Sequence, residues 1–107
     1  MEQKAHARLI DGAEVSMGGY TWVVPALTFG QLKKLDADLM AINTLSIGDK
    51  KSLEACARII HAALSRNYAD LTVANVSDIL DLRNARLALG AVTGQSGLVP
   101  NAAAVTE

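Results

Sequence analysis

The pattern of apolar and polar positions predicts two strands near the start of the chain and helices after them. Residues 20–24 have high strand propensity, and the preceding Gly18 and Gly19 can adopt positive φ, as a tight reversal requires. We therefore predict a β-hairpin whose first strand lies within residues 7–15 and whose loop lies near residues 14–19. Pro25 ends the second strand, because it has no N–H to donate to a ladder.

An amphipathic helix is predicted next. Thr28 is a suitable N-cap, and Gln31 follows three residues later, at the spacing of a capping box. Apolar residues then recur at steps of three, four and three, which places them on one stripe of a helix over about residues 29–42. This stripe would face the core, and any part that one hairpin leaves uncovered would form a groove for an amphipathic helix of another protein. The stripe residues are Leu32, Leu35, Leu39 and Ile42.

A second helix should follow a polar loop over residues 46–51. Apolar residues recur at helical spacing over residues 53–64. Ser52 is expected to cap this helix, and Asn67 can close it in the left-handed conformation that Asn tolerates.

The remaining apolar positions predict one or two further helices. Thr72 opens a third helical stretch, and residues 81–84 either kink it or begin a fourth helix over residues 85–92. Gly94 is expected to end that helix. The predicted fold class is α+β, mainly α, with an N-terminal β-hairpin packed on a small bundle of three to four helices.

The composition agrees with one small domain that gains from a partner. Half of the 107 residues are hydrophobic, but only 4% are aromatic. Domains of this size are marginal alone, so we expect self-association or a partner. We assign residues 1–98 to a single globular domain and residues 99–107 to a mobile C-terminal tail.

Charge and cysteine content limit the kinds of partner and the cellular compartment that we expect. A formal charge of −1 argues against a general nucleic-acid binder, which carries a concentrated basic field. A single cysteine, Cys56, allows no disulfide within the chain and favours a reducing compartment. We see no signal peptide, and no apolar run approaches the ~20 residues that cross a bilayer. A soluble, cytoplasmic protein is expected, without a membrane or nucleic-acid partner.

The residues that could carry chemistry do not form a catalytic, cofactor-binding or metal-binding set. Cys56 and His61 lie about 140° apart around one helix, and structural zinc sites usually have four ligands. Ser65 lies one turn after His61, but no acid is placed to orient the imidazole. Residues 90–96 lack the spacing and the lysine of a phosphate loop. We predict a binding protein without cofactors, and not an enzyme.

Three residues outside the leucine stripe are candidate partner contacts. Trp22 is either a core anchor or an anchor for a partner, and Tyr68 lies in a loop beside Arg66. Trp, Tyr and Arg are over-represented among interface hot spots. The candidate partner-binding residues are therefore Trp22, Leu32, Leu35, Leu39, Ile42, Arg66 and Tyr68.

The order of these features resembles the tail assembly chaperones of long-tailed, siphophage-type bacteriophages and prophages. The resemblance covers about residues 7–98. Its most telling part is the Leu-Ser-Arg-Asn-Tyr turn over residues 64–68, followed by a helix that Thr72 caps. The chain departs from the family at Ala69, where Pro is usual, and at residues 74–75, where acidic residues are usual. The further matching segments are Tyr20-Thr-Trp-Val-Val-Pro25, Phe29-Gly-Gln-Leu-Lys-Lys-Leu35, Leu80-Asp-Leu82 and Gly94-Gln-Ser-Gly97.

The resemblance implies a non-enzymatic chaperone of tail assembly. Such proteins bind the long, helical tape-measure protein, keep its apolar faces from aggregating and help to recruit tail-tube subunits. They act in the host bacterial cytoplasm, are absent from the mature virion, and several self-associate. The alternative is a structural tail-completion or connector protein that is retained in the virion. A small helix-turn-helix regulator is a third possibility, against which the missing basic recognition helix argues.

Overall fold

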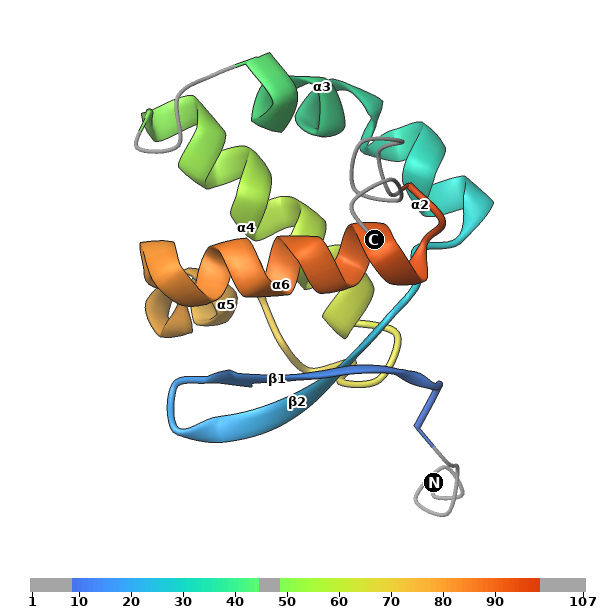
Figure 1. Cartoon of the computed structure of the whole chain (residues 1–107), viewed down its shortest axis with the longest axis vertical. Coiled ribbons are helices and arrows are strands. Elements are labelled where there is room, and N and C mark those ends of the chain that lie inside the picture. Colours follow the sequence, from blue (N-terminus) through green and yellow to red (C-terminus); the bar gives the residue numbers. More distant parts are fainter. Residues whose placement is uncertain (1–8, 45–48, 99–107) are drawn as a thin grey trace, which may run out of the picture.

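A two-stranded hairpin precedes five helices, so the predicted fold class, α+β and mainly α, is confirmed (Figure 1). The computed structural model describes residues 9–44 and 49–98, and the predicted tail over residues 99–107 lies outside this part of the chain. Within this part of the chain, five helices replace the expected three to four. The described elements are β1 (Gly12–Met17), β2 (Tyr20–Pro25), α2 (Phe29–Lys34), α3 (Asp36–Thr44), α4 (Lys50–Leu64), α5 (Val73–Ile79) and α6 (Leu82–Gln95).

Two glycines make the whole hairpin turn. β1 and β2 pair antiparallel, with Met17 opposite Tyr20 at the closed end. Gly18 and Gly19 have φ of 60° and 86°, the positive values that a type I′ turn requires. The predicted loop over residues 14–19 was therefore too wide, because two glycines suffice to reverse the chain and the residues before them continue the strand.

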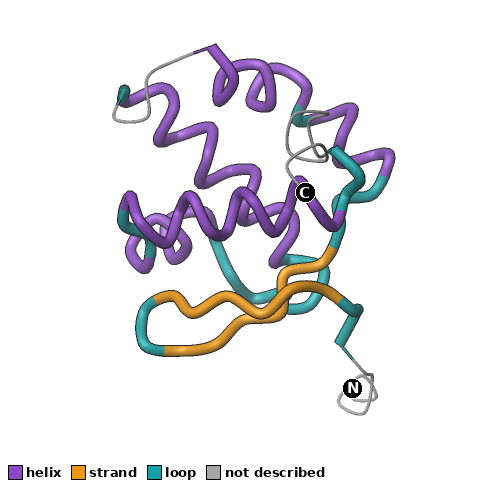
Figure 2. Tube along the Cα trace, viewed as in Figure 1, coloured by secondary structure: helices purple, strands orange, loops and turns teal. Residues whose placement is uncertain are grey.

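One face of the hairpin covers the helices. Val15 and Met17 are buried, while Glu14 and Ser16, which alternate with them, are exposed, as expected for a sheet with one solvated face. α6 lies along the hairpin and contacts both strands, and α4 contacts β2 (Figure 2).

The predicted helix over residues 29–42 is broken at Leu35 into α2 and α3. Its start is confirmed, since Thr28 and Gln31 form the expected capping box. Leu35 has φ of −97° and ψ of 11°, outside the helical region, and is buried. Before the break, the Gln31 side chain donates to the Ala62 carbonyl at 2.8 Å, and after it α3 contacts α4.

The ends of α4 differ from the prediction. Its N-cap is Asp49, whose carboxylate accepts from the Lys51 N–H at 2.9 Å, and Ser52 is buried inside the helix. Among the described non-glycine residues none has a positive φ, so Asn67 does not close α4 in a left-handed conformation. α4 instead ends at Ser65 in right-handed helical geometry, and the Asn67 side chain bonds to distant residues.

A new helix follows α5 rather than a kink. Leu80 is extended, with ψ of 142°, and ends α5. Asp81 then forms a capping box with Asn84 and starts α6 at Leu82. Gly94 does not end α6, which runs to Gln95, and the left-handed residue after it is Gly97.

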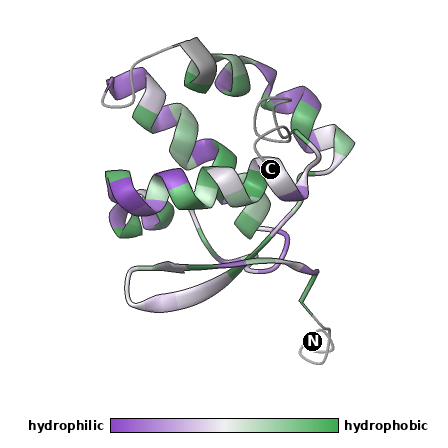
Figure 3. Ribbon diagram, viewed as in Figure 1, coloured by the Kyte–Doolittle hydropathy of each residue, from purple (hydrophilic) through white to green (hydrophobic). Residues whose placement is uncertain are grey.

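α4 lies at the centre of the core. Hydrophobic and hydrophilic positions alternate around α4 and α6 (Figure 3), and the small residues Ala85 and Ala88 of α6 are buried in the cluster that α4 dominates. The hairpin adds Val24 and α5 adds Val76 to this cluster. The α4 residues in it are Cys56, Ile59, Ile60, Ala63 and Leu64.

We expect Gly90→Ala to raise the free energy of unfolding by about 0.5–1 kcal/mol, because glycine in a helix interior costs backbone entropy. Gly90 lies in α6, is exposed, and a Cβ built on it meets nothing within 4 Å. Urea unfolding of the variant beside the wild type measures the difference. A loss of stability would contradict the open space at this position.

Candidate partner-binding surface

The turn after α4 contacts the hairpin, mainly where Tyr68 of the turn packs on Trp22 of β2. Their rings pack edge to face, with centroids 5.0 Å apart and planes at 84°, a favoured aromatic arrangement. The Val23 N–H donates to the Tyr68 hydroxyl at 3.0 Å, and the Trp22 Nε1–H donates to the Met17 carbonyl at 2.9 Å. These polar groups are thus used within the subunit.

Arg66 and Asn67 make further bonds of the same kind. Arg66 Nη1 donates to the Ala26 carbonyl at 2.7 Å. The Asn67 side chain accepts from the Ile10 N–H at 2.6 Å and donates to the carbonyls of Ile10 and Val23 at 3.1 and 3.2 Å. One side chain therefore joins the segment before β1 to β2 and to the end of α4.

The structure brings Trp22 of β2 together with Arg66 and Tyr68 of the turn after α4, and it places the leucine stripe elsewhere. Leu35 is buried, and Leu32, Leu39 and Ile42 are partly buried and pack against the core. The stripe is thus largely covered within one subunit. A role for these residues in partner binding stays a prediction.

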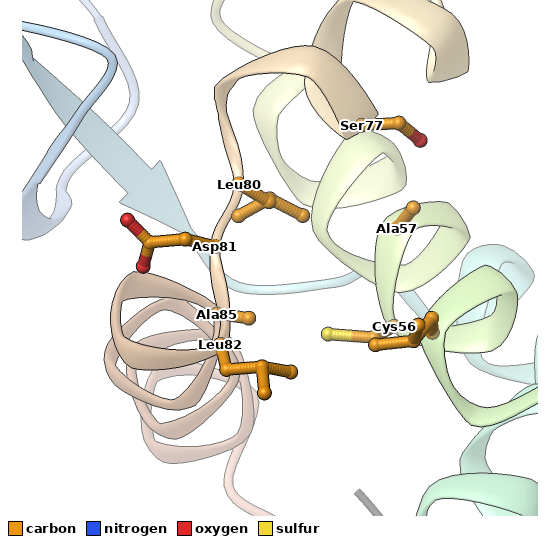
Figure 4. Close-up of a pocket in the computed structure, with 8 residues that line it drawn as sticks. Cys56, Ala57, Ser77, Leu80, Asp81, Leu82 and Ala85 are labelled. Atoms are coloured by element: carbon orange, nitrogen blue, oxygen red, sulfur yellow. The ribbon is translucent and has the colours of Figure 1, made fainter. Parts of the chain in front are cut away.

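A pocket of about 380 Å³ opens between α4 and the α5–α6 junction. Figure 4 shows the Cys56 side chain pointing from α4 toward Leu82 and Ala85, while the Asp81 carboxylate points away from it. Asp81 Oδ1 accepts from the Asn84 N–H at 2.8 Å, so the carboxylate serves the helix cap. The lining residues are Leu53, Cys56, Ala57, Ser77, Leu80, Asp81, Leu82 and Ala85.

A second, open depression adjoins this pocket at Leu82, which lines both. Two leucines and two arginines of α6 line it: Leu82, Arg83, Arg86 and Leu87. The exposed fractions of Leu53, Leu82 and Leu87 are 43%, 49% and 60%. We call the continuous surface over both hollows the α4–α6 groove, defined by Leu53, Leu80, Leu82, Arg83, Arg86 and Leu87.

Sequence reasoning missed the groove. Leu53 and Leu82 have the helical spacing of core residues, and only the packing of α6 on α4 leaves them half exposed. Helical periodicity could have identified Leu87 as exposed, because it lies about 160° around the helix from the buried Ala85. A leucine on the face opposite the core is a candidate contact residue.

Of the side chains considered for catalysis or metal binding, His61 and Ser65 make structural hydrogen bonds and Cys56 lines the pocket. His61 Nε2 lies 2.9 Å from the Leu71 carbonyl, and the Ser65 hydroxyl donates to the Ala62 carbonyl at 2.8 Å, so the two do not bond to each other. Over residues 9–44 and 49–98, no group of three or more His, Cys, Asp or Glu side chains could hold a metal ion.

Burial of the Cys56 thiol should make the free energy of unfolding depend on pH in the alkaline range. Burial raises its pKa to about 11 from the ordinary 9.0, because an apolar site disfavours the thiolate. As pH rises, the thiol therefore ionises in the unfolded state before it ionises in the folded state. Its contribution to the free energy of unfolding is constant below pH 9.0 and decreases between pH 9.0 and about 11. We expect wild type to lose stability relative to Cys56→Ala in that window. Urea titrations of both proteins below and above pH 9.0 test this, and parallel curves would contradict it.

The chain has no match among protein-family models, curated proteins or solved structures. Among the described helices, none has the length and apolar character to cross a membrane.

Proposed function

We propose that the chain is a non-enzymatic phage tail assembly chaperone. In this role it binds the tape-measure protein and helps to recruit tail-tube subunits in the host bacterial cytoplasm, and it is absent from the mature virion. The order of motifs in the sequence supports the family. The turn over residues 64–68 and the helix that Thr72 caps are its most specific part.

The observation that carries the proposal is the α4–α6 groove. The half-exposed Leu53 and Leu82 line its pocket together with buried Cys56, Ala57 and Ala85. Fully burying a leucine side chain contributes about 1.5–3 kcal/mol, so covering Leu53 and Leu82 would contribute about 1 kcal/mol each. A groove of this kind suits the apolar face of a client helix.

Self-association belongs to the same proposal and would use other surfaces. Tyr20 and Phe29 are strongly exposed on β2 and α2, and neither lines the groove. Large aromatic side chains of this kind are enriched at interfaces between subunits.

Coexpression with the tape-measure protein tests the proposed function. We expect the chain to copurify with that protein and to keep it soluble, and Leu82→Asp to abolish both effects. Ser16→Asp, on the solvated face of the hairpin, introduces the same charge and should bind as the wild type does. Loss of the tape-measure protein to the pellet in the presence of the wild-type chain would refute the proposal.

Analysis of purified particles separates the chaperone from the alternative, a tail-completion or connector protein. A chaperone is expected to be missing from virions in mass spectrometry. Detection of the chain at a fixed copy number per particle would favour the connector.

A further inference from the structure

We infer that the α4–α6 groove takes one amphipathic helix whose apolar stripe is flanked by acidic residues, which pair with Arg83 and Arg86. This inference rests on the proposed function and specifies the chemistry of the client segment. It follows from the arrangement of charge around the exposed leucines.

Two leucine–arginine pairs form the edge of the groove. Leu82 and Arg86, like Arg83 and Leu87, are four residues apart on α6 and therefore neighbours on its surface. All four side chains are exposed. Leu82 and Leu87 lie about 140° apart around α6, with both arginines between them. A helix laid over Leu82 would thus bring the residues along one edge of its stripe to both guanidinium groups.

The two arginines lack partners within the described part of the chain. Neither Arg83 nor Arg86 makes a hydrogen bond or ion pair with a described residue, whereas Arg58 of α4 pairs with Asp38 at 2.7 Å. The one carboxylate that lines the pocket, Asp81, caps α6 and points away from Cys56 (Figure 4). Two positive charges therefore remain to select an acidic partner, although the chain as a whole has a formal charge of −1.

The same charges argue against a second copy of the chain as the occupant. A two-fold interface presents the same patch from both subunits. Pairing through α6 would bring four arginines into one interface with no free carboxylate of the groove between them, and such like-charge contacts are costly.

A small molecule is also a poor occupant. Ligand pockets combine apolar walls with a few polar groups that orient the ligand. Here the Asp81 carboxylate is used for capping, which leaves the Ser77 hydroxyl as the polar side chain that lines the pocket. The pocket also opens at Leu82 into the second depression rather than enclosing a small ligand.

Two synthetic helices provide the test. Each has about 20 residues, above the length at which isolated helices are marginal, and carries the same leucine and alanine stripe. The flanking residues are Glu in one and Lys in the other. We expect the Glu peptide to bind about tenfold more tightly at low salt, as two exposed ion pairs allow, and the difference to shrink as salt screens the charges.

Variants of the groove residues test whether the preference for the Glu peptide arises at the groove. Reversing both charges in Arg83→Glu/Arg86→Glu should reverse the order of the two peptides, and Leu82→Asp should abolish binding of both. The matched control is Lys33→Glu/Lys34→Glu, which makes the same charge change on exposed residues of α2, beyond the C-terminal end of α6 (Figure 1). This control should keep the order seen with wild type.

The outcomes separate this inference from the proposed function. Equal binding of the two peptides, or an order that the arginine variant leaves unchanged, would overturn the inference. A dimer that Leu82→Asp dissociates would overturn it in favour of a second copy. If the tape-measure protein copurifies equally with wild type and Leu82→Asp, the proposed function stands and the groove is not its site. If the peptides behave as expected and the tape-measure protein does not copurify, the proposed function fails and the selectivity of the groove stands.

Discussion

Replacing Leu64 with Ala is expected to lower the free energy of unfolding by about 3 kcal/mol, because the truncation leaves a cavity in a packed core. Leu64 is 0% exposed and ends α4 within the main hydrophobic cluster. Such a loss is a large part of the 5–15 kcal/mol that typically stabilises a domain. Urea unfolding followed by the fluorescence of Trp22, the single tryptophan, measures it.

Leu87→Ala is the matched control for this prediction. Leu87 is 60% exposed, and surface substitutions usually change stability by less than about 0.5 kcal/mol. The same chemical change should therefore have very different effects at the two positions. Similar losses in both variants would contradict the described placement of α4 and α6.

Gly12→Ala is expected to destabilise the protein by about 2 kcal/mol, in the range for overpacked sites. A Cβ at Gly12 would press on the backbone carbonyl of Val24 and lie 2.7 Å from the Pro25 nitrogen. Gly12 pairs with Pro25 at the open end of the hairpin, and backbone atoms cannot rotate away as a side chain can. The strands must therefore separate locally, although Gly12 has an ordinary extended conformation.

Gly90→Ala makes the same substitution at an open site and is expected to act in the opposite direction. Hydrogen exchange adds a local measurement, since the amides of β1 and β2 near Gly12 should lose protection before those of α4. A Gly12→Ala variant as stable as wild type would show that the two strands tolerate a wider spacing at this end.

Local signals predicted most of the elements. The capping boxes at Thr28 and Thr72 each depend on residues within one turn, so the sequence reveals where those helices begin. The hairpin turn was predictable for the same reason, because Gly18 and Gly19 meet its steric requirement within the turn itself.

Features that depend on distant residues were not predictable. The break at Leu35 accompanies contacts of Gln31 with Ala62, which lies 31 residues away. Asn67 was assigned a local role in closing α4, but its side chain bonds to Ile10 across 57 residues. A helical pattern shows which face of a segment is apolar and not which elements will cover it.

The candidate site was also hard to predict, because the sequence does not show which apolar faces other elements cover. The leucine stripe of α2 and α3 was expected to face the core and to leave any uncovered part as a groove for a partner helix, and it packs largely inside the subunit. Leu82 and Leu87 are exposed because α4 and the hairpin cover other faces of α6. Distinguishing the two surfaces required the arrangement of the helices in space.

The contact between β1 and α6 has a consequence for synthesis on the ribosome. The hairpin emerges well before α6, so Val15 and Met17 stay uncovered until nearly all of the described chain has been translated. Apolar surface that is exposed in this way is prone to aggregation. A nascent chain stalled before residue 82 should therefore be retained by cellular holdases, and release should follow once α6 has left the exit tunnel.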